Sequence, residues 1–184
     1  MPRMALLVID VQNEYFTGKL PVTFPNGSLA NILRCMDESS KSGIPVAVIQ
    51  HSSSGNTFRK GTAGWELHDE IRKRKYDVLI EKHLPGSFTG TGLEDWLRQN
   101  SIDTVAITGY MTQMCCDTTA RQALHRGYGV EFLSDATGTL AITNSAGFVS
   151  AGDLHKAILV TQESRFSKVM DTDSWIGAMK DTLQ

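Results

Sequence analysis

Thr104-Val-Ala-Ile-Thr-Gly-Tyr-Met-Thr-Gln-Met-Cys-Cys-Asp-Thr-Thr-Ala-Arg121 joins the pattern of a buried strand to the pattern of a helix. Its apolar run stops before Gly109, and residues from about Asp117 to His125 favour a helix. A strand that leads directly into a helix is half of the βαβ unit from which parallel sheets are built. Cys115 falls at this junction, where free backbone N–H groups and the helix dipole favour a thiolate.

The same alternation of strand and helix patterns continues along the whole chain. Strands are expected over Ala5–Asp10, Pro45–Gln50, Asp77–Glu81, Thr104–Thr108, Gly129–Leu133 and Lys168–Met170. Helices are expected over Ser28–Ser42, Glu66–Arg72, Leu93–Gln99, Cys116–Arg126, Ser145–Glu163 and Thr172–Thr182. Several strands are continuously apolar, as strands covered on both faces are. The sequence therefore predicts one α/β domain over residues 1–184, a three-layer α/β/α arrangement around a mostly parallel sheet.

Composition narrows the classes of partner and the cellular compartment. The net charge is −2 and charges of both signs are mixed, so no basic surface suggests a nucleic-acid partner. The first apolar run, Met4 to Ile9, is too short for a signal peptide or a membrane span, and no membrane partner is expected. Three cysteines, two of them adjacent, do not form a disulfide framework. This pattern fits a reducing, cytoplasmic location.

Three reactive residues follow predicted strands at the edge where open parallel sheets bind ligands. Asp10 closes the first strand, Lys82 follows the third, and Cys115 lies just beyond the fourth. A carboxylate, an ammonium and a thiol at one edge make a candidate catalytic cluster. Simpler interpretations stay open, because Asp10 suits a turn or a helix cap and Lys82 suits an exposed strand end.

The three cysteines differ in their helical neighbours. Cys116 aligns with small residues at Ala120 and Ala123, a stripe suited to packing on the sheet, and Cys35 falls inside a core-facing helix. Cys115 shares its face with polar residues and is predicted to face the polar mouth of the site.

A substrate pocket is expected around the same edge. His51 ends the second strand without a nearby carboxylate or a ligand-spaced histidine, so neither a metal nor any other cofactor is predicted. Aromatic residues in the loops after strands, among them Tyr15 and Phe58, suggest an apolar pocket for a small molecule. The residues expected to line it are Gln12, Phe16, His51, Trp65, Phe88, Tyr110 and Thr119.

Four ordered blocks of the sequence resemble the isochorismatase-like cysteine hydrolase superfamily. Leu7–Asn13 is similar to its opening strand and catalytic aspartate. Gly61–His68 is similar to the loop that leads into a helix before its third strand. Glu81–Phe88 is similar to its lysine block, and Gly109–Ala120 to its nucleophile block. The resemblance implies a six-stranded parallel sheet of Rossmann-like type, a triad of Asp10, Lys82 and Cys115, and a homo-oligomer, either a dimer or a tetramer. It also implies a cis peptide at Tyr110–Met111.

The resemblance implies a hydrolase that cleaves an amide or imide C–N bond of a small molecule through a thioester. In that mechanism Cys115 attacks a carbonyl carbon, Asp10 moves the protons, and the backbone N–H groups of Met111 and Cys115 bind the oxyanion. Two related activities are less favoured. Nicotinamidases carry a metal-binding aspartate and paired histidines where His51 stands alone, and vinyl ether hydrolysis by isochorismatases proceeds without the cysteine. A non-catalytic small-molecule binder or a redox thiol protein on the same fold remains the alternative from another class.

Overall fold

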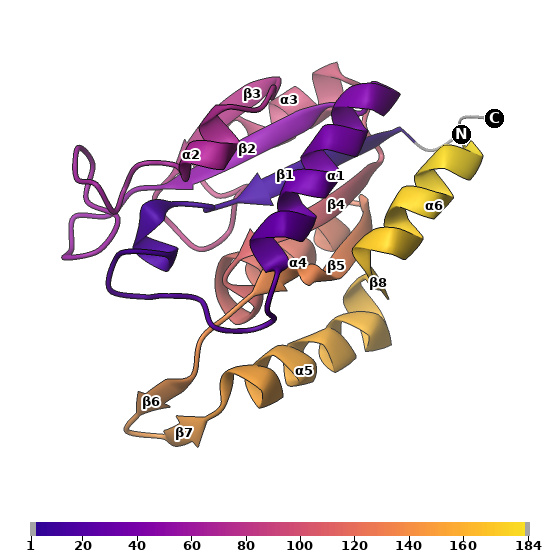
Figure 1. Ribbon diagram of the computed structural model, residues 1–184. Helices are drawn as coiled ribbons and strands as arrows, with labels where there is room; N and C mark the ends of the chain where they lie inside the picture. The colour runs from indigo at the N-terminus through magenta and orange to yellow at the C-terminus, as the bar shows by residue number, and fades with distance from the viewer. Residues whose placement is uncertain (1–2, 183–184) are drawn as a thin grey trace.

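A computed structural model describes residues 3–182 and forms a central sheet of six parallel strands (Figure 1). The predicted domain spans 1–184, of which residues 1–2 and 183–184 lie outside the described part. The strand order is β3-β2-β1-β4-β5-β8, and every neighbouring pair is parallel. The strands are β1 (Met4–Ile9), β2 (Val46–His51), β3 (Val78–Lys82), β4 (Thr104–Tyr110), β5 (Gly129–Gly138) and β8 (Lys168–Met170). The predicted α/β class and six-stranded parallel sheet are confirmed.

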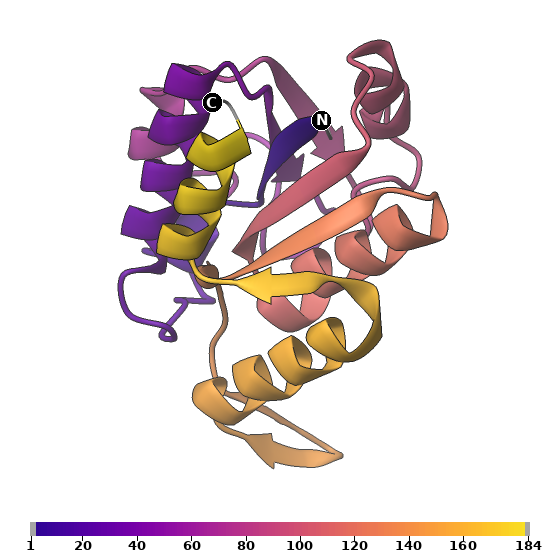
Figure 2. The ribbon, with the colours of Figure 1, turned by 90° about the vertical axis from the view of Figure 1, so that its right-hand side faces the viewer.

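Helices cover both faces of this sheet, giving three layers (Figure 2). The α1 and α6 helices lie on one face, and α3 and α4 lie on the other. The helices are α1 (Ser28–Ser42), α2 (Asp69–Arg72), α3 (Leu93–Gln99), α4 (Asp117–His125), α5 (Ala151–Thr161) and α6 (Thr172–Thr182). A 3₁₀ turn, η1 (Asn13–Tyr15), and two π turns, η2 (Thr112–Cys116) and η3 (Gln162–Phe166), complete the helical segments. Within residues 3–182, no helix has both the length and the apolar character needed to cross a membrane.

The continuously apolar strands supply two cores, because successive side chains point to opposite faces. In β1, Leu6 and Val8 belong to the core beneath α1 and α6. Leu7 and Ile9 belong to the core beneath α3 and α4. All four side chains are fully buried. Burial on both faces makes β1 a rigid central strand, and it ends at the predicted site.

The helix predicted over Ser145–Glu163 is wrong at its amino end. A small antiparallel hairpin, β6 (Ile142–Asn144) and β7 (Gly147–Val149), precedes the helix and projects from the body of the molecule (Figure 1). The Asn144 side chain accepts a hydrogen bond from the Ala146 N–H, and Gly147 adopts a φ of 135°, so turn chemistry overrides the helical pattern here. The helix begins only after Ser150, whose side chain caps it by accepting from the Asp153 N–H.

The helix predicted over Glu66–Arg72 is also shorter than expected, because α2 begins at Asp69. The Nδ1 atom of His68 accepts from the Glu70 N–H and caps the helix. The two preceding residues are occupied elsewhere: the Glu66 carbonyl accepts from Asn13, and Leu67 forms an isolated bridge with Gln12. Tertiary pairing with the loop after β1 therefore replaces the first helical turn.

Candidate active site

Asp10, Lys82 and Cys115 meet at the carboxyl edge of the sheet, where β1, β3 and β4 end. The Lys82 Nζ atom lies 2.8 Å from Asp10 Oδ2 and 3.2 Å from Cys115 Sγ. The side chains of Asp10 and Lys82 are completely buried, and Cys115 is 8% exposed. A fully buried ion pair is costly unless its geometry is good, so its presence beside a thiol indicates a specialised site.

Close approach of β4 to β1 helps to bring these groups together. Gly109 pairs with Ile9 and adopts a φ of 112°, a conformation that favours glycine. A Cβ atom at this position would lie 2.0 Å from the Ile9 carbonyl oxygen. Asp10, the residue directly after the end of β1, has a φ of 52°. Gly109 therefore allows the nucleophile block to lie directly against the aspartate-bearing strand.

Cys115 lies in the π turn η2, which begins at Thr112, four residues before the helix start predicted at Cys116. The preceding Tyr110–Met111 peptide is cis. Met111 is buried between β4 and η2, and η2 continues directly into α4. The turn thus lies at the amino end of a continuous helical segment, where backbone N–H groups lack intrahelical partners.

The predicted resting thiolate is wrong for Cys115. Burial raises the pKa of the Cys115 thiol, and the Asp10 carboxylate raises it further, while Lys82 opposes both effects. Burial acts to lower the pKa of Lys82, but Asp10 and Cys115 bring it above its ordinary value. The resting site therefore holds a thiol beside a charged ammonium and a carboxylate.

His51 also contacts the buried ammonium, because its Nδ1 atom lies 3.1 Å from Lys82 Nζ. Burial and the Lys82 charge lower the pKa of His51, so the ring is neutral at neutral pH. An ammonium can only donate, so Nδ1 accepts and Nε2 carries the ring proton. Gln12 holds this residue in place by accepting from its N–H at 2.8 Å and donating to its carbonyl at 2.9 Å.

A row of packed aromatic rings extends from His51 to Phe16. Phe58 meets His51 at a ring separation of 5.4 Å and Tyr15 at 5.0 Å. Tyr15 in turn meets Tyr110 at 5.6 Å, and Tyr110 meets Phe16 at 5.7 Å. Burial raises the pKa of Tyr15, and the charges of Cys115 and Asp10 add to the effect.

Other residues expected to line a pocket are held by structural contacts. Trp65 donates to Ser52 Oγ through its indole N–H. The Thr119 hydroxyl lies 2.8 Å from the Ser87 hydroxyl, and it accepts from the Ser87 N–H. Phe88 is buried against Tyr128, with Arg126 over its ring. Phe88 therefore belongs to the core beneath α3 and α4.

Tyr15 and Phe58 were available as loop aromatics in the sequence, yet the predicted lining omits them. Nothing in their spacing indicates which aromatic residues turn toward Asp10. Cys116 and Cys35 are fully buried, as predicted, and all three cysteines are free. The described residues contain no group of three or more histidine, cysteine or acidic side chains that could hold a metal ion.

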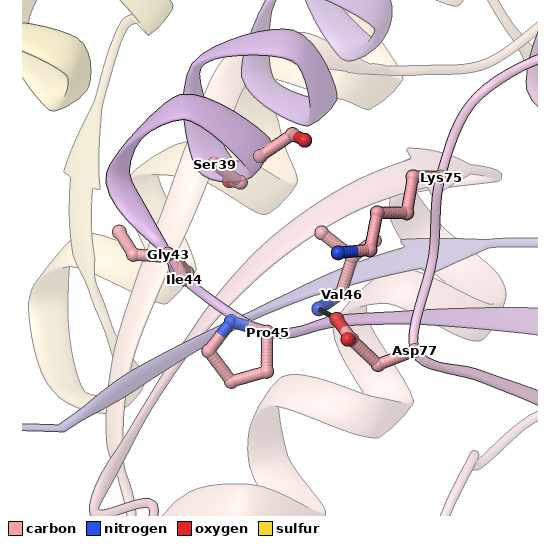
Figure 3. A pocket seen from close by; sticks show the side chains of 8 residues that line it. Ser39, Gly43, Ile44, Pro45, Val46, Lys75 and Asp77 are labelled. Atoms are coloured by element: carbon pink, nitrogen blue, oxygen red, sulfur yellow. Dashed lines mark hydrogen bonds between the residues drawn. The ribbon is translucent and has the colours of Figure 1, made fainter.

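A separate pocket opens at the opposite edge of the sheet (Figure 3). It lies at the start of β2, where Asp77 accepts a hydrogen bond from the Val46 N–H at 2.8 Å, and Lys75 forms part of its wall. The reactive cluster lies past the other end of the same strand, at His51. This pocket is therefore not part of the Cys115 site.

Comparison with known proteins identifies relatives along most of the chain. The isochorismatase domain model matches residues 4–174. The isochorismatase-family protein YddQ of Bacillus subtilis is 32% identical over 176 residues, covering 94% of this chain and 98% of its own. A crystal structure from Burkholderia xenovorans shares 47% identity with a TM-score of 0.95, covering 98% of this chain and 88% of its own.

Several relatives have names that state an activity. N-carbamoylsarcosine amidase from Thermoplasma acidophilum has a solved structure with 28% identity and a TM-score of 0.78, covering 94% of this chain and 98% of its own. Nicotinamidase 3 of Arabidopsis thaliana is 29% identical, covering 92% of this chain and 85% of its own. With the domain match over residues 4–174 and the shared six-stranded fold, this chain belongs to the isochorismatase family of hydrolases.

Proposed function

We propose that the protein is a cysteine hydrolase that cleaves an amide or imide C–N bond of a small molecule through a thioester. The observation that carries this proposal is the contact of one buried ammonium, Lys82, with both the Asp10 carboxylate and the Cys115 thiol. A nucleophile, a proton acceptor and a fixed positive charge within hydrogen-bonding reach are the parts that acyl transfer needs. The amidase among the relatives supports the same bond type.

In the first step, the Cys115 thiol passes its proton to Asp10 as its sulfur bonds to the substrate carbonyl carbon. The raised pKa of the thiol fits a proton that leaves during attack rather than before it. The Lys82 ammonium stabilises the negative charge as it develops on sulfur. Asp10 then returns the proton to the substrate nitrogen, the C–N bond breaks, and the amine departs from a thioester on Cys115.

The developing oxyanion needs hydrogen-bond donors that are already in position. We assign this role to the backbone N–H groups of Met111, which directly precedes η2, and of Cys115, which lies within it. Loss of a single donor of this kind costs about 3 kcal/mol in transition-state stabilisation in a well-studied hydrolase.

Water completes the cycle. Asp10 accepts a proton from the water molecule as its oxygen attacks the thioester carbon. The C–S bond breaks, the carboxylic acid product leaves, and the proton returns from Asp10 to the sulfur. No step needs a group from outside the chain other than substrate and water.

Nicotinamide is a second candidate substrate, favoured by the similarity to Nicotinamidase 3. It is itself a small aromatic amide, and the row of packed rings formed by Phe58, Tyr15 and Tyr110 is of suitable chemistry to lie against it. Vinyl ether cleavage is less favoured because it gives the buried thiol no role.

The decisive experiment is a screen of small amides, ureas, imides and lactams, nicotinamide included, for release of ammonia or amine. We expect turnover of at least one compound by the wild-type protein and none by the Cys115→Ala variant. Equal turnover by both proteins would refute the thioester mechanism. Tight binding without turnover would instead support the non-catalytic binder, and a reversible thiol oxidation that alters binding would support the redox protein.

We also propose a cytoplasmic homo-oligomer, a dimer or tetramer, with no nucleic-acid or membrane partner. The three free cysteines support a reducing compartment, and the net charge of −2 gives no basic surface for a nucleic acid. The homo-oligomer rests on the family resemblance alone. Light scattering on the purified protein tests the assembly, and a monomer at micromolar concentration would contradict it.

A further inference from the structure

His155 is a buried histidine outside the triad. In α5, which the structure describes in full, it is the only buried residue, and its side chain is 3% exposed. The Phe24 ring packs edge-on against it at a centroid distance of 5.4 Å. A polar ring buried this completely is costly unless both of its nitrogens are hydrogen bonded.

Both ring nitrogens have partners, and the direction of each bond follows by elimination. Nε2 lies 2.8 Å from the Ser134 carbonyl oxygen, which can only accept, so Nε2 carries a proton. Burial lowers the pKa of His155, so the ring is neutral and Nδ1 has no proton. The Thr112 hydroxyl, 2.8 Å from Nδ1, must therefore donate to it.

Thr112 connects this histidine to the nucleophile. It is fully buried, it is the first residue of η2, and it precedes Cys115 by three positions. It also follows Met111 directly, so it lies between the residues proposed to supply the two oxyanion donors. Neither nitrogen of His155 bonds to Asp10, Lys82 or Cys115.

We propose that His155 is a positioning residue that fixes the nucleophile turn by accepting a hydrogen bond from Thr112 and anchoring it to the β5 backbone at Ser134. The inference rests on the proposed function, because it assigns a role in placing Cys115. A displacement of a reacting group by a fraction of a bond length lowers the rate strongly, so a turn pinned at its first residue matters for catalysis. The α5 helix thereby contributes to the site without reaching the substrate.

Thr112→Val and Thr112→Ser form a matched pair that tests this link. Valine keeps the shape of the threonine side chain but removes the hydroxyl that donates to His155, whereas serine keeps that hydroxyl. The first readout is the rate of Cys115 alkylation by iodoacetamide, followed by peptide mass spectrometry, with the buried Cys35 and Cys116 as internal controls. We expect Thr112→Val to lower the rate about tenfold, the scale of one hydrogen bond, and Thr112→Ser to stay within about twofold of wild type.

His155→Gln and His155→Asn test the other end of the bond. The asparagine amide can occupy the position of Nδ1 and accept from Thr112, whereas the glutamine amide reaches toward Ser134 and leaves Thr112 unpaired. We expect His155→Gln to lower kcat for the best amide of the screen while KM changes little, and His155→Asn to restore most of kcat. Because both changes break one bond, the combined Thr112→Val/His155→Gln variant should be no slower than the poorer single variant.

Thermal unfolding of each variant separates loss of fold from loss of positioning. An unchanged or faster alkylation rate in folded Thr112→Val, or additive losses in the double variant, would overturn the inference. If the wild-type thiol is reactive and amides are hydrolysed while these variants match wild type, only the role of His155 fails. If the wild-type protein shows no turnover and an inert Cys115, the proposed function fails, and this inference fails with it.

Discussion

The charged residues at the amino ends of the strands (the amino edge of the sheet) and at their carboxyl ends (the carboxyl edge) differ in how deeply they are buried. At the amino edge, Lys75 and Asp77 are exposed residues beside an open pocket, and Asp77 simply satisfies a backbone N–H at the start of β2. At the carboxyl edge, Lys82 and Asp10 are buried completely beside a thiol. An exposed charge costs the fold almost nothing, whereas a buried pair needs compensation. Costly burial of reactive groups, rather than an open concavity, therefore marks the functional end of this molecule.

The largest expected effect is the difference in hydrolysis rate between substitutions of two adjacent cysteines, Cys115 and Cys116, at the carboxyl edge. Replacing the nucleophile in Cys115→Ala should lower the rate of hydrolysis by about 10⁴-fold or more. Cys116→Ala should retain turnover and lose about 1 kcal/mol of stability, because Cys116 only fills space beneath α4. Steady-state kinetics and urea unfolding measure both effects. An active Cys115→Ala protein would remove the distinction between the two residues.

Loss of a lysine should have opposite consequences at the two edges. Lys82→Met leaves the Asp10 carboxylate buried without its partner and should destabilise the protein by about 3–5 kcal/mol, with loss of turnover. Lys75→Met at the amino edge should change the free energy of unfolding by no more than about 0.5 kcal/mol. Urea denaturation of the two variants checks this comparison. Similar stability losses at both edges would mean that burial of Lys82 has no special cost.

Loss of a carboxylate should change the pKa of Cys115 at the carboxyl edge, but not when the carboxylate lost is at the amino edge. Because the Asp10 charge raises the pKa of Cys115, Asp10→Asn should lower that pKa and give about tenfold more thiolate at a given pH. Turnover should nevertheless fall, since the proton acceptor is gone. Titration of the thiolate by its ultraviolet absorbance measures the midpoint.

Asp77→Asn is the matched control for this titration. It should leave the midpoint of Cys115 unchanged and cost about 1 kcal/mol through its bond to Val46. A midpoint that rises in Asp10→Asn would contradict the assigned electrostatics of the site.

The smallest expected effect is a change in turnover between the neutral and the protonated states of the His51 ring. Since burial and Lys82 lower the pKa of His51 from 6.5, its ring stays neutral through the neutral range and gains a proton only at more acidic pH. A protonated Nδ1 cannot accept from Lys82, so turnover should fall at pH values below 6.5. His51→Asn keeps an acceptor near that position and should lack this acid limb. A pH–rate profile that is identical in both proteins would assign the limb to another group.

The sequence was a good guide wherever local pattern and burial agree. The continuously apolar run of β1 and the strand–glycine–helix junction at Gly109 predicted the sheet and the edge where the reactive residues gather. The hairpin before α5 was not predictable in the same way, because one side-chain bond from Asn144 and the conformation of Gly147 determine it. Such local competition leaves little trace in residue periodicity.

The same difference separates the site residues that could be predicted from those that could not. Strand ends identified Asp10, Lys82 and Cys115 as neighbours, but side-chain direction decided the rest. Tyr15 packs against Phe58 and Tyr110 on one face of the sheet, whereas Phe88 packs in the core on the other face, although both follow strands and are aromatic. Burial and the Asp10 carboxylate raise the pKa of Cys115, so a helix-terminus argument alone gave the wrong direction for its pKa.

The formation of a thioester on Cys115 is the claim from which the rest of the account follows. Acid quenching of the wild-type protein during turnover of an amide found in the screen, followed by peptide mass spectrometry, tests it directly. We predict that the acyl part of the substrate is attached to the peptide containing Cys115, and that Cys115→Ala carries none. An acyl group on another residue, or wild-type turnover by Cys115→Ala, would contradict the account.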